Sequence, residues 1–223
     1  MKVCTDACLF GAWVVSEIER GDKKIEKILD IGTGTGLLSL MLAQKTNANI
    51  DAVEIDDSAA LQATNNFSFS LWKDRLKVYQ TSIQQFSSGV TYDLIISNPP
   101  FFSNDLKSDD KRRNLALHSD ALSLEELIKY VDVHLSSNGL FAVLLPYSRT
   151  DYLEKIVATY KSFFLQSKVL VKQTERHDYF RSMLLFSKSA STSSYSTNEI
   201  VIQNNNAYTS HFIGLLKDYY LHL

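Results

Sequence analysis

Glycine and proline, the two residues with unusual backbones, are concentrated at two points of this chain of 223 residues. Three of the eight glycines are Gly32, Gly34 and Gly36, and two of the three prolines are the adjacent Pro99 and Pro100. Closely spaced glycines let a backbone turn tightly and approach a ligand. Adjacent prolines remove two backbone donors and leave carbonyl oxygens free to accept hydrogen bonds. The first segment therefore predicts a ligand-binding loop, and the second predicts a site for a group that donates hydrogen bonds.

The glycine-rich segment Asp30–Gly36 reads DIGTGTG, and it lies between an apolar run and a run that favours a helix. This is the context of a nucleotide-binding loop. Glu54 ends the next predicted strand, where a carboxylate can accept hydrogen bonds from two ribose hydroxyls. The spacing G-x-G-x-G differs from the G-x-G-x-x-G of dinucleotide loops. In addition, Asp30 would repel phosphate but suits a cationic sulfonium ligand that carries an amino group.

These features indicate S-adenosylmethionine rather than NAD as the cofactor. The alternative interpretation is a tight turn between a strand and a helix, with no ligand. The residues assigned to the cofactor from this segment and its acidic partner are Asp30, Gly32, Thr33, Gly34, Gly36 and Glu54.

The second segment, Asn98-Pro99-Pro100-Phe101, follows a run apolar enough to be a central strand. The side-chain oxygen of Asn98 and the carbonyl of Pro99 can accept the two N–H bonds of a planar group that bears an NH2, and Phe101 can stack on its plane. Such acceptors hold an exocyclic amine out of plane and localise its lone pair, which makes it a better nucleophile. Alignment and desolvation supply the rest of the catalysis. The alternative is a strand terminator with a packed aromatic ring.

Alternating strands and helices are needed to place both segments at one edge of a parallel sheet. The strands are expected at 25–31, 50–53, 76–79, 93–97, 140–145, 169–171 and 183–186, and the helices at 7–18, 37–44, 58–72, 124–135 and 208–221. The last two strands are joined by a charged loop at 174–181 without a helix, which favours an antiparallel pair at one edge. The sequence thus predicts an α/β Rossmann-like fold with a seven-stranded, mostly parallel sheet, one antiparallel edge strand and helices on both faces. Residues 1–223 are expected to form a single domain.

Bulk properties exclude several other classes of protein. The chain is 45% hydrophobic and 22% charged, which is typical of a globular protein and not of a disordered one. Its net charge is −2, so no global positive field marks it as a nucleic-acid binder, although residues 155–188 hold seven basic and two acidic residues. No membrane-length apolar run and no metal-ligand spacing is present, and the two cysteines form no disulfide framework. A cytoplasmic protein without a metal is expected, with a monomer slightly favoured.

The two segments resemble known motifs. DIGTGTG resembles the first motif of class I methyltransferases, and NPPF resembles the (N/D/S)PP(Y/F/W) motif of amino-methyltransferases, which act on adenine N6, guanine N2 or a glutamine amide. Further stretches are similar to one family, the bacterial tRNA1(Val) adenine-37 N6-methyltransferases. The stretches that carry this resemblance are Lys2–Asp6, Leu9–Trp13, Ile83–Phe86, Phe180–Phe186 and Tyr219–Leu221.

The resemblance implies transfer of a methyl group from S-adenosylmethionine to N6 of adenine 37 in the anticodon loop of a valine tRNA. It assigns catalysis to Asn98, Pro99, Pro100 and Phe101, and it adds Thr5, Ile55, Ser82 and Ile83 to the cofactor-binding residues. Thr5 could instead cap the helix at 7–18, which is the favoured reading. The residues expected to bind RNA are Lys111, Arg112, Arg113, Arg176 and Arg181. For residues 111–113 a solvated run of charge is an equally good interpretation.

The sequence departs from the family pattern at three points. Chains of the family usually carry a further, often basic, segment before the stretch that begins at Lys2, whereas here only Met1 precedes it. Ser82 stands where an aspartate commonly contacts the adenine of the cofactor, and Leu117 stands where a basic residue is usual. Three other functions remain open at this point: N5-methylation of a glutamine in a protein, N2-methylation of a guanine in ribosomal RNA, and a catalytically silent scaffold that only binds the cofactor.

Overall fold

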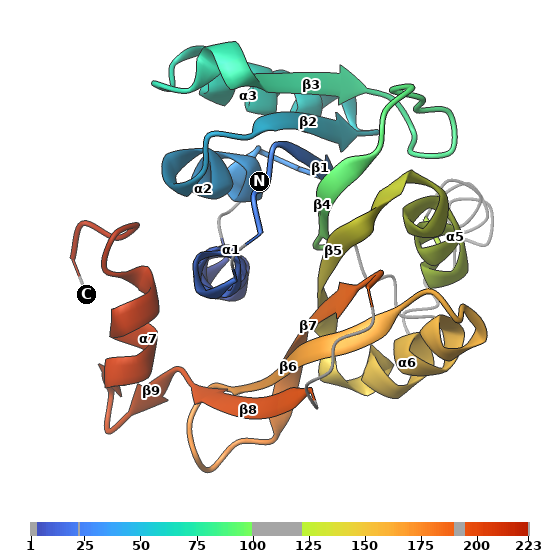
Figure 1. The fold of residues 1–223 in the computed structure, drawn as a ribbon. Helices are drawn as coiled ribbons and strands as arrows, with labels where there is room; N and C mark the ends of the chain where they lie inside the picture. Colours follow the sequence, from blue (N-terminus) through green and yellow to red (C-terminus); the bar gives the residue numbers. More distant parts are fainter. Residues whose placement is uncertain (1–3, 22, 100–121, 190–194, 223) are drawn as a thin grey trace, which may run out of the picture.

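The computed structural model describes residues 4–21, 23–99, 122–189 and 195–222. Its centre is an eight-stranded sheet in the order β3-β2-β1-β4-β5-β7-β6-β8 (Figure 1). The strands are β1 (Lys27–Ile31), β2 (Asn49–Glu54), β3 (Leu76–Gln80), β4 (Tyr92–Ser97), β5 (Leu135–Pro146), β6 (Phe164–Lys172), β7 (Tyr179–Ser187) and β8 (Ser196–Val201). All neighbours are parallel except β7, which is antiparallel to both β5 and β6.

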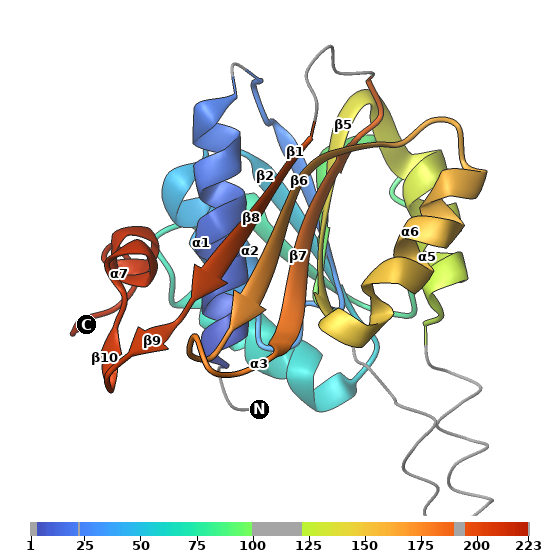
Figure 2. The same ribbon diagram turned by 90° about the horizontal axis from the view of Figure 1, so that it is seen from below.

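Helices cover both faces of the sheet, as Figure 2 shows for α1 and α7 on one side and α5 and α6 on the other. The helices are α1 (Thr5–Arg20), α2 (Leu37–Lys45), α3 (Asp57–Ser68), α5 (Leu124–His134), α6 (Thr150–Thr159) and α7 (Ser210–Leu216). Among the described residues, none of these helices combines the length and the apolar character that a membrane crossing requires.

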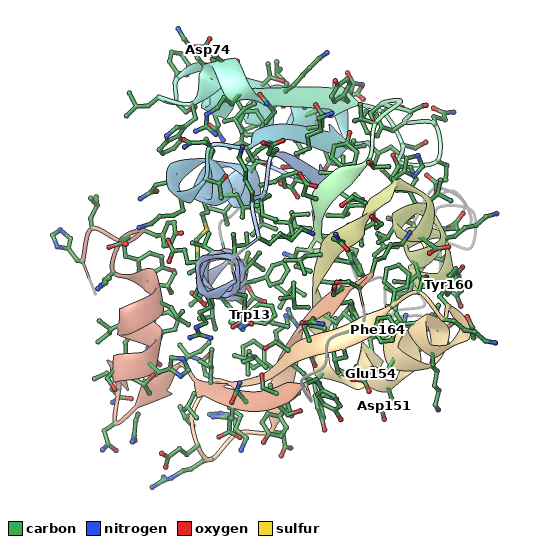
Figure 3. All side chains as sticks on the ribbon, viewed as in Figure 1. Trp13, Asp74, Asp151, Glu154, Tyr160 and Phe164 are labelled. Atoms are coloured by element: carbon green, nitrogen blue, oxygen red, sulfur yellow. The ribbon has the colours of Figure 1, made fainter. Side chains whose placement is uncertain are left out.

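The core is divided by the sheet into two clusters of buried side chains. One cluster joins α1, α2, α3 and α7 to the sheet through Trp13, Leu42, Phe67 and Phe212. Trp13 is 3% exposed and lies in the space between α1 and the sheet (Figure 3). The other cluster lies under α5 and α6 and includes Leu127 and Leu153. Because both faces are covered, the central strands are mostly apolar, and their buried polar residues include Asp30 on β1 and Ser97 on β4.

The predicted fold class is confirmed, with two differences at one end of the sheet. The single reversed strand, β7, lies between β5 and β6 instead of at the edge. An eighth strand, β8, pairs with β6 in a parallel register. The sequence did not indicate β8 because Ile200 is the one fully buried residue among its six, so its pattern has no apolar alternation.

The C-terminal helix is shorter than the predicted segment 208–221. A small hairpin of β9 (Gln203–Asn204) and β10 (Ala207–Tyr208) precedes it. Asn205 and Asn206 form the turn with positive φ angles of 49° and 62°, which suits a two-residue hairpin loop. Thr209 then caps α7 by accepting a hydrogen bond from the amide of Phe212.

Candidate active site

The carboxyl ends of β1, β2 and β4 meet at one edge of the sheet. β1 lies between β2 and β4, so the chain first builds the sheet outwards through β3 and then returns to the other side of β1. A crevice forms above the strand ends at such a switch point, and open α/β sheets bind their ligands there. The glycine loop follows β1 and Asn98 follows β4, so both motifs lie at this edge of the sheet.

The three glycines of the loop share a backbone conformation, and two of them differ in what surrounds them. Gly32, Gly34 and Gly36 have positive φ angles of 71°, 57° and 84°, a region that favours glycine. A Cβ atom at Gly36 would lie 2.4 Å from Cε1 of Phe67 on α3, whereas a Cβ atom at Gly32 would meet nothing within 4 Å. Gly36 therefore permits close packing of the loop on α3, and Gly32 presents bare backbone to open space.

Glu54 connects the glycine loop to the end of β2. Its Oε2 accepts a hydrogen bond from the amide of Gly34 at 2.8 Å, and its Oε1 accepts one from the amide of Asp56 at 2.9 Å. The amide of Gly32 donates to the carbonyl of Val53 at 2.9 Å, which draws the loop over the same strand end. Each carboxylate oxygen can accept a further hydrogen bond. Glu54 is thus fixed in place while it keeps acceptors for the two hydroxyls of a ribose.

Asp30 is completely buried beneath the loop. Its Oδ2 accepts hydrogen bonds from the hydroxyls of Thr33 at 2.6 Å and Ser39 at 2.7 Å. Its Oδ1 is also buried, but it has no hydrogen-bond partner among the described residues. Burial raises the pKa of Asp30 to about 6, and the two hydroxyl donors only partly oppose this effect. An unpaired buried acceptor is costly, so the site fits a ligand that brings positive charge or an N–H donor.

Ser39 is a site residue that the reasoning from sequence missed. It lies in α2, whose sequence LLSLMLAQK is otherwise apolar in its first turns, and its side chain is fully buried. A single serine inside an apolar helix next to a glycine loop was the available signal, because a buried hydroxyl requires a partner.

The residues assigned to the cofactor beyond this loop differ in exposure. Ile55, directly after Glu54, is 50% exposed. Ser82 follows β3, is partly buried, and accepts a hydrogen bond from the amide of Phe86 through its carbonyl at 3.0 Å. Ile83 is 5% exposed and packs in the cluster under α5 and α6. Ile55 and Ser82 are therefore accessible to solvent, whereas Ile83 packs in the core next to Ser82.

Asn98 is held next to the glycine loop by the pairing of β4 with β1. Ser97 pairs with Ile31 in the sheet, and its hydroxyl donates to the carbonyl of Ile31 at 2.9 Å. Asn98 is partly buried and Pro99 is buried. The predicted site residues Pro100, Phe101, Lys111, Arg112 and Arg113 lie outside the described residues.

The start of α1 is tied to β7. Cys4 occupies the N-cap position, and Asp6 in the first turn accepts a hydrogen bond from the amide of Ala7 at 3.0 Å. The other carboxylate oxygen of Asp6 accepts one from Nε of Arg181 at 2.7 Å. Arg181 is therefore engaged in an ion pair within the protein. Thr5 is exposed at the first position of the helix, so the prediction that Thr5 caps this helix is wrong.

Acidic residues from other elements offset much of the positive charge between residues 155 and 188. Four basic residues of this segment form ion pairs, namely Lys168 with Glu154, Lys172 with Glu199, Arg181 with Asp6, and Lys188 with Asp132. Arg176, by contrast, is exposed in the loop between β6 and β7. Of the two arginines of this segment assigned to RNA, Arg176 is thus the one that is presented to solvent.

Comparisons with known proteins identify the class to which this arrangement belongs. A crystal structure of a predicted O-methyltransferase from Agrobacterium tumefaciens superposes with a TM-score of 0.68 and 15% identity, covering 95% of both chains. Magnesium protoporphyrin IX methyltransferase from Synechocystis, solved with bound S-adenosylmethionine, has a TM-score of 0.58 and 15% identity, covering 82% of this chain and 80% of its own. The fold, with its glycine loop at the switch point, is that of a class I methyltransferase.

Sequence comparison defines the family within this class. The model of the methyltransferase small domain matches residues 14–157. The tRNA1(Val) (adenine(37)-N6)-methyltransferase of Flavobacterium johnsoniae is 40% identical over 99% of this chain and 93% of its own length. The enzyme of the same name from Trichodesmium erythraeum is 42% identical over 99% of this chain and 91% of its own length. This chain belongs to the family of tRNA1(Val) (adenine(37)-N6)-methyltransferases.

Proposed function

We propose that this protein transfers a methyl group from S-adenosylmethionine to N6 of adenine 37 in the anticodon loop of a valine tRNA. The observation that carries the proposal is the position of Asn98, which leaves β4 beside the glycine loop that follows β1. This arrangement occurs in a chain that is 40% identical over 99% of its length to an enzyme of that name.

The residues at the switch point fit S-adenosylmethionine. Bare backbone at Gly32 leaves room for the ligand, and Glu54 has free acceptor capacity for the ribose hydroxyls. The unpaired Oδ1 of Asp30 offers a carboxylate oxygen to a cationic group, directly or through a water molecule. Ile55 and Ser82 provide an apolar surface and a hydroxyl for the adenine. When bound, the cofactor supplies an electrophilic methyl group on a sulfonium centre.

The role of Asn98 and Pro99 in this proposal is to position the acceptor amine. The side-chain oxygen of Asn98 and the carbonyl of Pro99 accept the two hydrogens of adenine N6, which turns the nitrogen lone pair out of the plane of the ring. The lone pair then faces the methyl group, and a C–N bond forms as the C–S bond breaks. The surplus proton leaves N6 after the transfer, so no strong base is required. Adenine 37 lies in a single-stranded loop and can enter a pocket without the opening of a duplex.

The experiment is methylation of tRNA by the purified protein with labelled S-adenosylmethionine, followed by mass spectrometry of the nucleosides. The expected product is N6-methyladenosine, formed with a valine tRNA and absent when position 37 carries guanosine. Label that enters only protein would identify a glutamine methyltransferase, and N2-methylguanosine would identify a guanine methyltransferase. Cofactor binding without any product would identify a silent scaffold. Each of these three results would contradict the proposal.

We further propose that residues 1–223 act as one catalytic domain and that the protein works as a monomer in the cytoplasm, where tRNA is modified. Both core clusters share the single eight-stranded sheet, which supports one folding unit. Light scattering of the purified protein tests the monomer, and a mass twice that of the chain would contradict it.

A further inference from the structure

A pair of tyrosines lies at the same edge of the sheet as Asn98. Tyr147 follows β5 directly and begins a short 3-10 helix, η2 (Tyr147–Arg149), while Tyr179 begins β7. Their ring centroids are 5.2 Å apart, with an angle of 49° between the rings. Tyr147 is 43% exposed. Because β5 and β7 are antiparallel, the carboxyl end of β5 and the beginning of β7 meet at the edge where the site lies.

Tyr179 on β7 is fixed by one residue from β6, the adjacent strand, and one from β8, the strand beyond it. Nζ of Lys172 on β6 lies 4.5 Å from the centre of the Tyr179 ring. The Tyr179 hydroxyl donates to Oε2 of Glu199 on β8 at 2.5 Å, and the same oxygen pairs with Nζ of Lys172 at 3.0 Å. The ring therefore has a cation against it and an anchored hydroxyl, and Lys172 offsets the negative charge of Glu199.

The backbone of Tyr147 is also fixed. Its carbonyl accepts a hydrogen bond from the hydroxyl of Thr150 at 2.8 Å. Thr150 is 3% exposed and also hydrogen-bonds to the hydroxyl of Ser182 on β7. An exposed aromatic ring that is already ordered loses little conformational entropy when a partner stacks on it.

The tyrosine pair lies within reach of an RNA loop whose adenine is bound at Asn98. Ser97 pairs with Val143 on β5, and β5 continues through Pro146 before it reaches Tyr147. Three residues of strand beyond the level of Asn98 span about 10 Å, a distance that a splayed single strand can bridge. Single-stranded RNA is commonly held by stacking of its bases on aromatic side chains, and tyrosine stacks on any base.

We propose that Tyr147, supported by Tyr179, is a stacking subsite for a nucleobase that neighbours the adenine to be methylated. This inference rests on the proposed function, because it assumes that the reacting base is part of a single-stranded RNA loop. The exposed Arg176, in the loop that joins β6 to Tyr179, is placed to meet the phosphate backbone beside this base.

The test compares Tyr147→Ala, Tyr147→Phe and a matched control, Tyr152→Ala. Tyr152 is also 43% exposed, on α6, but it is not part of the ring pair. The dissociation constant of an RNA hairpin with the anticodon stem and loop of a valine tRNA is measured by fluorescence anisotropy. We expect Tyr147→Ala to weaken binding by about 5- to 100-fold, and Tyr147→Phe and Tyr152→Ala to stay within about twofold of wild type.

Two further readouts separate stacking from a general loss of structure or charge. When the hairpin carries the fluorescent base 2-aminopurine next to position 37, binding of the wild-type protein or of Tyr147→Phe should change the fluorescence of this base. Binding of Tyr147→Ala should not change it. The slope of log affinity against log salt should be unaltered in Tyr147→Ala, because stacking releases no counterions. Thermal unfolding and calorimetric affinity for S-adenosylmethionine serve as controls of folding.

Binding of Tyr147→Ala within twofold of wild type, or an equal loss in Tyr152→Ala, would overturn the stacking subsite. Methylation of the same hairpin by the wild-type protein is followed in parallel. Its absence would overturn the proposed function, whereas methylation at position 37 combined with an unchanged KM in Tyr147→Ala would overturn the subsite alone.

Discussion

At the scale of single residues, Asn98 should affect turnover and binding very differently. Its side-chain oxygen is proposed to contact the acceptor amine and not the cofactor, so Asn98→Ala should lower kcat by roughly 100- to 1,000-fold. The calorimetric Kd for S-adenosylmethionine should change by less than about twofold, since the glycine loop and Glu54 are untouched. Asn98→Asp retains an acceptor oxygen and should keep more activity than alanine. A loss of cofactor affinity that matches the loss of kcat would mean that Asn98 belongs to the cofactor site.

Asp30 is expected to couple stability to pH. Its pKa rises from 3.8 to about 6 on folding because the carboxyl is buried. A raised pKa means that the folded state binds the proton more tightly than the unfolded state. The contribution of Asp30 to the free energy of unfolding is therefore largest below pH 4 and is lost as the pH rises through 6. Between pH 5 and pH 7 the free energy of unfolding of the wild-type protein, measured by urea titration, should fall by about 1 kcal/mol more than that of Asp30→Asn.

The same carboxyl should make binding of the cofactor depend on pH in the opposite direction. A cationic ligand favours ionised Asp30, so the affinity for S-adenosylmethionine should rise by up to about tenfold between pH 5 and pH 7. The affinity of Asp30→Asn should be flat across this range. If the calorimetric affinity for S-adenosylmethionine changes with pH equally in the wild-type protein and in Asp30→Asn, Asp30 does not interact with the ligand.

At the scale of elements, the turn from β1 to α2 depends on two glycines in different ways. Gly36→Ala combines a φ of 84° with a Cβ atom 2.4 Å from Phe67, so both backbone strain and overlap oppose it. Gly32→Ala carries the strain of a φ of 71° but meets no atom. We expect Gly36→Ala to cost about 2–4 kcal/mol of unfolding free energy and Gly32→Ala about 1–2 kcal/mol.

The two substitutions should rank in the opposite order in their effect on binding of S-adenosylmethionine. After correction for the folded fraction, Gly32→Ala should weaken S-adenosylmethionine binding strongly, because its methyl group occupies the space that the ligand needs. Denaturant titration and calorimetry of the two variants test both rankings, and equal effects of Gly32→Ala and Gly36→Ala on stability would contradict the packing role of Gly36.

The elements of the cofactor half could be predicted from the sequence because local signals agree there. Apolar runs end at Gly32, at Glu54 and at Asn98, and each marks the carboxyl end of a strand in the structure. The far half was less predictable. β8 has one fully buried residue, and the contact between Arg181 and Asp6 joins residues 175 positions apart, so no local pattern encodes either feature. The tyrosine pair was missed for the same reason, because its partners come from η2 and from three different strands.

At the scale of the whole molecule, the ion pair between Asp6 and Arg181 connects the first turn of α1 to β7, 175 residues further along the chain. The side chains are 15% and 30% exposed, so the pair is partly shielded from water. Arg181→Ala should lower the free energy of unfolding by about 1 kcal/mol, and a double-mutant cycle with Asp6→Ala should recover most of this as coupling.

The RNA-binding behaviour of two arginines distinguishes a structural role from a phosphate contact. Arg176→Ala should reduce the slope of log affinity against log salt by about 0.7, the value for one phosphate of a single strand. Arg181→Ala should leave the slope unchanged, because the arginine is already paired with Asp6. A reduced slope in Arg181→Ala would show instead that Arg181 contacts a phosphate of the RNA.

The insertion of β7 between β5 and β6 has a consequence for how the chain is made. The ribosome completes β5 and β6 before β7 exists, yet these two strands are bridged in the native sheet only by β7. Until about residue 187 has emerged, the outer edge of β5 and both edges of β6 therefore lack partner strands, because β8 also follows β7 in the chain, and open edges invite pairing with other chains. Premature termination within the loop between β6 and β7 should yield an aggregating product, because this half of the sheet can close only after β7 and β8 have been made.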